Sequence, residues 1–290
     1  RSGHAASSAA PPRWLPRGRS RGARRRCGPC SSSVCLSSRP WRLDSRGKCV
    51  VNRPEVRLAK RKRSFLRRLA ATVALRCLVW LALSLGVVLV LRVVDPPTTA
   101  VMLLQPGAIS ELEYTWVDRD AIAASAARAV MAAEDQRFIQ HHGIDFVSVD
   151  EALADYRDGD GLRGASTITQ QVAKNLFLWQ GRSFVRKGLE AYFAVLLEMC
   201  WTKERILEVY LNIAELGPGL FGVEAAAREY FDSSPPALTT EQAALLAAVL
   251  PNPQRLLAAR PSAYVRGRQA QIVVQMRLLE SRGHYRGIDW

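Results

Sequence analysis

The chain has 290 residues, 48% of them hydrophobic, and a formal net charge of +15. Residues 1–94 contain 22 Lys and Arg against 2 Asp and Glu, whereas residues 95–290 contain 19 against 24 and are therefore net acidic. A nucleic-acid-binding domain would carry its basic surface on the folded part, so this distribution argues against nucleic acid as a partner. The length accommodates one domain of roughly 200 residues plus further segments.

The N-terminal arm, residues 1–68, is basic and rich in Arg, Ser and Pro. It lacks apolar periodicity, so we predict that it is disordered. It begins with Arg rather than Met, and its first 60 residues need not be native to the protein. Four of the six cysteines lie in this arm, and their spacing resembles a metal site only loosely, because almost nothing around them can be buried.

Residues 69–94 form an apolar stretch that only Arg76 and Arg92 interrupt with charge. About 20 helical residues cross a bilayer core, and arginines near the ends can extend to the headgroups. Basic residues precede the stretch and Asp95 follows it, which predicts a single-pass inner-membrane anchor with a cytoplasmic N-terminus and a periplasmic domain at residues 95–290. No small-residue cleavage site follows, so we expect an uncleaved anchor; a buried core helix is the alternative.

The rest of the chain is mostly helical by its apolar period. A linker from Pro96 to about Tyr114 comes first. Three helices are then predicted: one capped by Asp120 and reaching Glu134, one within residues 166–179, and one from Ser183 to Met199. Three more follow: one capped by Thr202 and stopping at Gly217, one from Thr239 or Thr240 with a capping box at Gln242, and one from about Ser262 to Ser281. No strand pattern of comparable length is present.

Three segments carry candidate chemistry. In EDQRFIQHHGID, Glu134 and Asp135 lie at a helix-to-loop junction, where general acid–base residues are often placed, although a solvated acidic face would look the same. In GASTITQQVAKNL, a dense polar row precedes Lys174 and favours the wall of a polar cleft; a Ser/Thr-capped helix start with a solvated lysine is the alternative.

In RSFVRKGLE, Arg182, Arg186 and Glu190 lie on one helix face at i, i+4 and i+8. A surface ion-pair ladder has the same spacing. The apolar run at residues 191–197 argues against a surface helix, because it predicts that the helix is largely buried beyond Glu190.

These three segments and KERILEVYLNIAELGPGLFGVEAAA, in this order, resemble the glycosyltransferase family 51 domain over about residues 98–285. The resemblance implies a mainly α fold, with a lysozyme-like lobe and a smaller membrane-facing lobe, preceded by a single transmembrane helix. It also implies polymerisation of lipid II onto a growing glycan strand on undecaprenyl diphosphate, during cell wall synthesis. The transpeptidase boxes of bifunctional members are missing, apart from an S-x-x-K in the arm, so the monofunctional type is expected.

The resemblance also assigns site residues. Glu134 matches the catalytic base, and Glu190 matches a second essential glutamate that acts near the diphosphate, directly or through a divalent ion such as Mg or Mn. His141 matches a motif position for which we favour a structural role. The cleft and support positions, which we take as substrate-binding, are Asp135, Phe138, Ser166, Thr167, Gln170, Gln171 and Asn175.

Residue chemistry supports a transferase independently. Joining a sugar hydroxyl to an anomeric carbon bearing a diphosphate needs a base and cations for the leaving group, which Lys174, Arg182 and Arg186 supply. A hydrolase needs a general acid for its leaving group instead. The alternatives are a lytic transglycosylase or muramidase and an inactive wall-binding scaffold; protein partners in wall synthesis cannot be identified from the sequence.

Between these cations lies the apolar run Leu176–Trp179. Four consecutive large apolar residues span every side of a helix and cannot all face one core. Core burial is the default, but the lipid-linked substrate favours a second membrane contact here. We therefore predict an interfacial contact at Phe177, Leu178 and Trp179, with at least two of the three side chains exposed.

Overall fold

A computed structural model of the chain describes residues 41–43, 45, 49–51, 55–105, 111–158, 166–181 and 183–290. The chain divides into two units, residues 1–68 and residues 69–290. In the first unit, strands β1 (Trp41–Leu43) and β2 (Cys49–Val51) pair antiparallel, and helix α1 begins at Glu55. The arm for which disorder was predicted thus contains residues that the structure describes as strand and helix; Val50 and Val51 are β-branched and favour a strand, and the Arg- and Lys-rich residues after Glu55 favour a helix. The metal-like cysteine spacing lies mostly outside the described residues.

Helix α1 runs from Glu55 to Leu91. Its segment Phe65–Leu91 is long and apolar enough to cross a membrane, and most of its large apolar side chains are exposed. The structure therefore supports the predicted anchor as a candidate membrane helix. The helix ends three residues before the expected Val94.

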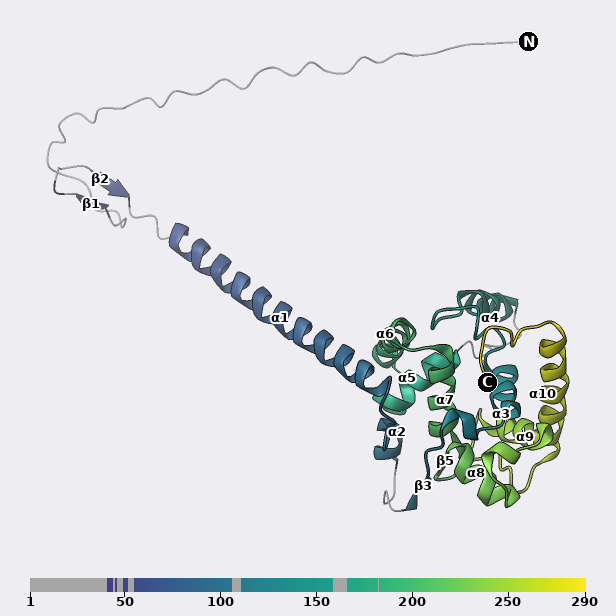
Figure 1. Cartoon of the computed structure of the whole chain (residues 1–290). Coiled ribbons are helices and arrows are strands. Elements are labelled where there is room, and N and C mark those ends of the chain that lie inside the picture. Colours follow the sequence, from purple (N-terminus) through teal and green to yellow (C-terminus); the bar gives the residue numbers. More distant parts are fainter. Residues whose placement is uncertain are drawn as a thin grey trace, which may run out of the picture. The chain divides into compact units, whose positions relative to one another are not determined.

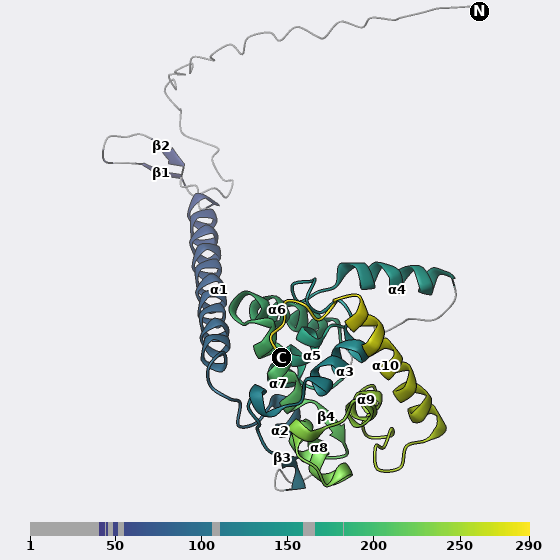
Figure 2. The same cartoon turned by 45° about the vertical axis from the view of Figure 1, so that its right-hand side comes forward.

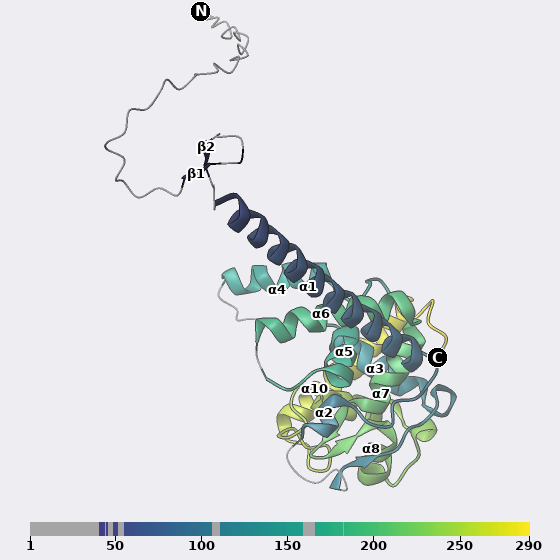
Figure 3. The ribbon, with the colours of Figure 1, turned by 90° about the vertical axis from the view of Figure 1, so that its left-hand side faces the viewer.

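The C-terminal part of α1 packs on α6 (Phe184–Cys200) and α7 (Lys203–Ile213) of the second unit (Figure 3). The hydroxyls of Ser84 and Tyr192 lie 2.7 Å apart. Arg205 donates hydrogen bonds to the carbonyl oxygens of Leu91 and Val94, each at 3.1 Å. Carbonyls at a helix end lack partners within the helix, so Arg205 satisfies the last turn of α1 and fixes its exit.

The second unit is mainly helical, as predicted from the apolar period. Figures 1 and 2 show α3, α9 and α10 packed together, with α5 lying against α6 and α7. The remaining helices have the bounds α2 (Ala100–Leu103), α3 (Ala124–Glu134), α4 (Phe146–Asp158), α5 (Ile168–Phe177), α8 (Gly222–Phe231), α9 (Thr240–Val249) and α10 (Ala263–Ser281), with 3₁₀ turns at Arg119–Ala121 and Pro235–Ala237. Strands β3 (Glu113–Tyr114), β4 (Glu215–Gly217) and β5 (Leu220–Phe221) form a small sheet in the order β3-β5-β4, with β3 parallel and β4 antiparallel to β5.

Most predicted helix starts are confirmed. Ser183, Thr202 and Ser262 each cap a helix by accepting a hydrogen bond from the backbone N–H three residues further on. Thr239 and Gln242 form the expected capping box at the start of α9. These interactions join residues three apart, which explains why the sequence alone identifies them.

Three predictions about boundaries are wrong. Asp120 caps no α-helix, because a 3₁₀ turn takes residues 119–121 and α3 starts after Ala123 without a side-chain cap. Helix α7 ends at Ile213 instead of Gly217, since residues 215–217 pair as strand β4. The expected linker contains α2, whose Val101 and Met102 are buried.

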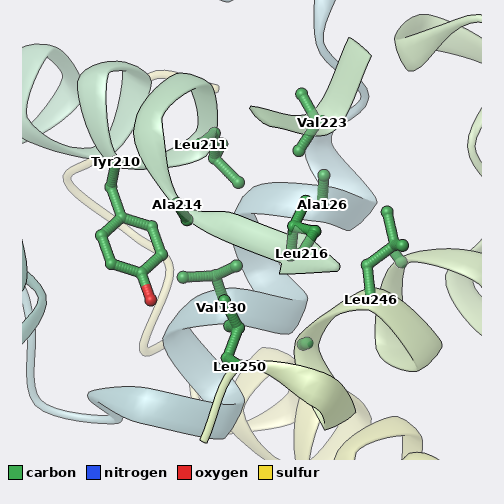
Figure 4. A pocket seen from close by; sticks show the side chains of 11 residues that line it. Ala126, Val130, Tyr210, Leu211, Ala214, Leu216, Val223, Leu246 and Leu250 are labelled. Carbon is green, nitrogen blue, oxygen red and sulfur yellow. The ribbon is translucent and has the colours of Figure 1, made fainter. Parts of the chain in front are cut away.

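The core of the second unit lies where α3, α7 and α9 meet. Alanines fill much of this contact, and small side chains allow the helices to approach closely. Figure 4 shows Val130, Leu246 and the ring of Tyr210 around an apolar void between these helices. The void has a volume of about 10 Å³, which is at the lower limit for one water molecule.

Candidate active site

A polar cavity of about 640 Å³ opens beside the end of α3. Parts of α3, α4, α5 and α10 form its walls, so the first two sequence motifs meet there. The lining residues that the sequence predicted as functional are Glu134, Asp135, Ser166, Thr167 and Gln171. A cavity of this size accommodates a drug-sized or sugar-sized ligand.

Glu134 is the last residue of α3, and its carboxyl faces this cavity. Gln171 Nε2 donates a hydrogen bond of 2.9 Å to its Oε2, and Arg268 Nη2 lies 3.4 Å from its Oε1. The side chain is 16% exposed. Burial raises the pKa of Glu134 above its ordinary value, while Gln171, Arg268 and Lys174 act in the opposite direction. A carboxylate that burial makes more basic is suited to accept a proton.

Asp135 lines the cavity, but its carboxylate oxygens bind groups of the chain itself. His141 Nε2 lies 2.9 Å and 3.0 Å from its two carboxylate oxygens, and Ile168 N–H donates to Oδ2 at 3.0 Å. Thr167 Oγ1 donates to the carbonyl oxygen of Gly143 at 2.6 Å, where the backbone turns at a φ of +86°. Together these bonds join the loop after α3 to the start of α5. The favoured structural role of His141 agrees with this geometry.

The polar row before Lys174 is only partly a cleft wall. Thr167 and Gln170 form a capping box on α5, and both are buried, as is Thr169. Phe138 is also buried, with the Lys203 ammonium 4.4 Å from its ring centre. Because neither Phe138 nor Gln170 reaches open space, their burial favours a support role, and substrate contact at these two residues stays a prediction. The capped helix start of our alternative is present, but its solvated lysine is not, because Lys174 is partly buried.

Glu190 lies on α6 with a side chain only 4% exposed. Arg186 Nη1 lies 2.6 Å from its Oε2 and Lys187 Nζ lies 2.5 Å from its Oε1. Lys187 also donates to Ser166 Oγ at 2.9 Å, which links α6 to the residues just before α5. The ion pair of Arg186 with Glu190 follows from their spacing. Lys187 was not predicted, although its i, i+3 spacing to Glu190 indicates such an ion pair.

Burial beyond Glu190 is less than the apolar run predicted. Of residues 191–197, only Ala194 and Leu197 are buried. The opposite face of α6 is exposed or lies beside α1, so the run does not mark a core helix.

Both glutamates, Glu134 and Glu190, affect the pKa of Lys174. Burial lowers its pKa, the charges of Glu190 and Glu134 raise it, and Arg186 and Lys187 lower it further. An ammonium group held away from water attracts an anion strongly. Asn175 is half-buried on the same helix. Arg182 lies outside the described residues.

Arg268 was not predicted. It lies on α10, 134 residues from Glu134 in sequence, and no local motif marks it. Only the packing of α10 against α3 brings its guanidinium to the cavity. Spacing rules read neighbours along one element, so they cannot identify such a pair.

The residues around Glu190 do not fit a divalent ion. Such ions need several oxygen ligands, whereas Lys174, Arg186 and Lys187 place positive charge around this carboxylate. Among the described residues, no group of three or more His, Cys, Asp or Glu side chains is arranged to hold a metal. We therefore derive no step through Mg or Mn.

The predicted exposure of the run after Lys174 is also wrong. Leu178 is 3% exposed and belongs to the interior, and Phe177 is half-buried with its ring stacked on Phe193 at 4.5 Å. Only Trp179, at 42%, is exposed. Because α5 ends at Phe177 and the chain becomes extended, successive side chains turn to different sides. The alternative, core burial, holds for Leu176 and Leu178.

The helical domain holds a carboxyl of raised pKa, Glu134, at a polar cavity, and carries ammonium and guanidinium groups around Glu190 on the adjacent helices α5 and α6. These are the parts of a group-transfer enzyme with an anionic leaving group. Comparison with known proteins identifies the family. Residues 103–277 match the family model described as Transglycosylase, and the chain belongs to this family.

Similar curated proteins agree with the family assignment. The chain is 52% identical over 204 residues to a biosynthetic peptidoglycan transglycosylase of Shewanella amazonensis, covering 69% of this chain and 83% of that protein. It is 49% identical over 221 residues to the protein of the same name in Pseudomonas aeruginosa, covering 74% and 93%. A Pseudomonas entomophila protein of that name is 48% identical over 233 residues, covering 78% and 97%.

Proposed function

We propose that this protein is an inverting peptidoglycan glycosyltransferase that polymerises lipid II into β-1,4 glycan strands and releases undecaprenyl diphosphate. The observation that carries the proposal is that α5 places a proton acceptor and a group of cations close together. Gln171 holds Glu134 at the cavity, and one turn further Lys174 lies near the cations of α6. The family and the names of the relatives support the same activity.

The chemistry assigns a role to each environment. Glu134 accepts the proton of the acceptor 4-hydroxyl as that oxygen attacks the anomeric carbon of the donor strand. The bond from this carbon to the diphosphate breaks on the opposite face, so the configuration inverts. Lys174, Arg186 and Arg182 stabilise the charge that develops on the departing diphosphate, where guanidinium groups can bind two oxygens at once.

Glu190 orders these cations in the proposed mechanism. With Arg186 and Lys187 on its two oxygens, it holds both side chains on the face of α6 that packs against α5. A buried carboxylate in this position reduces repulsion between neighbouring cations before the diphosphate arrives. Its role is then to position charge rather than to move a proton.

One assay tests the proposal against its alternatives. Purified full-length protein is incubated with labelled lipid II, and separately with preformed glycan strands. We expect polymer from lipid II and no shortening of strands. A lytic transglycosylase would shorten strands, and a scaffold would do neither; either result would overturn the proposal.

We also propose that α1 anchors the protein in the inner membrane, with the N-terminus cytoplasmic and the domain periplasmic. The asymmetry of basic residues around the helix supports this orientation. We place a second membrane contact on α6, and not at Trp179 and its neighbours. Phe184 is 98% exposed, and the exposed Val195 and Met199 lie on the same side of α6 by their helical spacing, as does Tyr192, which contacts α1.

Photo-crosslinking can test this face in proteoliposomes. Benzoylphenylalanine at position 184 should crosslink to lipid, whereas the same residue at exposed Ser234 on the α8–α9 connection should not. Equal lipid crosslinking at both positions, or none at 184, would contradict the contact.

A further inference from the structure

Tyr210 occupies an unexpected place for a polar side chain. It lies on α7, is fully buried, and packs its ring beside Val130 of α3 at the wall of the apolar void (Figure 4). Its hydroxyl donates a hydrogen bond of 3.0 Å to Gln171 Oε1. The other end of that amide, Nε2, donates to Glu134. A continuous chain of hydrogen bonds therefore runs from the core to the carboxyl.

The direction of this chain is determined at Tyr210. Burial and the nearby charges of Glu134 and Asp135 raise the pKa of Tyr210 well above its ordinary value, so the hydroxyl keeps its proton. A buried hydroxyl needs an acceptor, and the amide oxygen of Gln171 provides one. An amide carries an acceptor at one end and donors at the other. Once its oxygen faces Tyr210, its NH₂ group must face Glu134.

We propose, on the basis of the function proposed above, that Tyr210 is a positioning residue whose hydroxyl locks the Gln171 amide so that Glu134 always meets a hydrogen-bond donor. A donor stabilises the ionised carboxylate, which can accept a proton, more than it stabilises the protonated form. In the rotated amide, the oxygen would face Glu134 and favour its protonated form, but Tyr210 would lose its acceptor. Tyr210 thus disfavours the form of Glu134 that cannot act as a base.

Other charges around Glu134 define what the test must separate. Arg268 reaches it from α10, Lys174 from α5, and Asp135 follows it in the chain. Two of these groups are cations that favour the ionised form, and Asp135 opposes it. None of them depends on the orientation of the Gln171 amide. Removing the Tyr210 hydroxyl therefore changes one contribution and leaves the others in place.

The test is the pH dependence of lipid II polymerisation by full-length Tyr210→Phe. The ring stays packed, and the amide becomes free to rotate. We expect the acidic limb of the kcat/KM profile to move upward by about half a pH unit to one unit, the size that one hydrogen bond can contribute. Activity should fall about three- to tenfold on that limb and less than twofold at high pH.

Tyr230→Phe is the matched control. It also removes a hydroxyl from a partly buried tyrosine, one that donates to the Leu216 carbonyl oxygen at 3.4 Å, away from Glu134. Its profile should match that of the wild type. An equal loss of activity by Tyr210→Phe at every pH would show that Tyr210 is merely structural, and an unchanged profile would show that it has no role; both overturn the inference.

Two further measurements separate this inference from the proposed function. In a Gln171→Ala background, Tyr210→Phe should produce no additional shift, because the hydroxyl acts through that amide. The carbon-13 resonance of the Glu134 carboxyl, assigned with Glu134→Gln, can be titrated without substrate. If its pKa is the same in wild type and Tyr210→Phe, the inference fails even when lipid II is polymerised. If the pKa moves upward but no polymer forms, the proposed function fails alone.

Discussion

The two glutamates of the site occupy opposite kinds of environment. Glu134 ends a helix, faces a cavity and has an amide as its close partner, with a guanidinium at 3.4 Å. Glu190 lies inside a helix with a cation on each carboxylate oxygen. The same residue type can therefore accept a proton in one place and organise positive charge in the other, because partners and burial decide which form is favoured.

This comparison explains why the two residues cannot exchange roles. Proton transfer to Glu190 would leave Arg186 and Lys187 without a counter-charge, so its carboxylate is committed to them. Glu134 has no such commitment, and burial already makes its ionised form less favourable.

The largest effect is expected from Glu134→Gln. This change keeps the shape of the side chain and removes the proton acceptor, so turnover should fall by about 10²–10⁴, the usual contribution of a positioned base. Polymerisation of labelled lipid II measures it, with circular dichroism to verify the fold. Retention of more than a tenth of wild-type turnover would refute the assignment.

A smaller effect is expected on the cation side. Lys174→Ala and Arg182→Ala should each weaken binding of a diphospholipid donor analogue by about 10–100-fold, because each removes a charged hydrogen bond. Arg182→Lys should restore binding only in part, since the two-pronged contact is lost. Glu134→Gln and the exposed Arg277→Ala serve as controls and should bind normally. Unchanged affinity in both cation variants would remove the diphosphate from this region.

The sequence predicted what is encoded locally. The caps at Ser183, Thr202, Thr239 and Ser262 and the pair Arg186–Glu190 all join residues three or four apart, and all are present. The motifs also located Glu134 and Gln171 correctly at a polar cavity.

The failures have a common physical cause. Arg268 and Tyr210 reach Glu134 and Gln171 only through the packing of distant helices. Gln170 is buried in the capping box of α5, and Leu178 is buried where the chain becomes extended just after α5. A polar row or an apolar run shows only which residue types are present. Whether each side chain is exposed depends on its tertiary contacts.

Stability should distinguish the two glutamates further. Glu190→Gln leaves two cations around a neutral, buried amide, so the free energy of unfolding should fall by about 1–3 kcal/mol, as for a charged group that loses its partner. Thermal unfolding in detergent measures the loss. Glu280→Gln is the control, because Glu280 pairs with Arg128 at the surface and such a pair contributes about 0–1 kcal/mol. Equal losses in both variants would mean that the buried cluster is no stronger than a surface pair.

The smallest expected effect is a gain in stability for Glu134→Gln, in contrast to the loss expected for Glu190→Gln. Burial raises the pKa of Glu134 in the folded state above that in the unfolded chain. The stabilisation from its protonated form is complete below the unfolded pKa and is lost as the pH rises through the folded pKa. At about pH 8 the wild type therefore holds an unfavourable carboxylate, which the variant lacks.

Glu134→Gln should melt at a higher temperature than the wild type at about pH 8, with the difference shrinking toward zero near pH 4. Melting curves at both pH values test this, and a variant that melts lower than the wild type at pH 8 would show that Arg268 and Gln171 outweigh burial at this carboxyl.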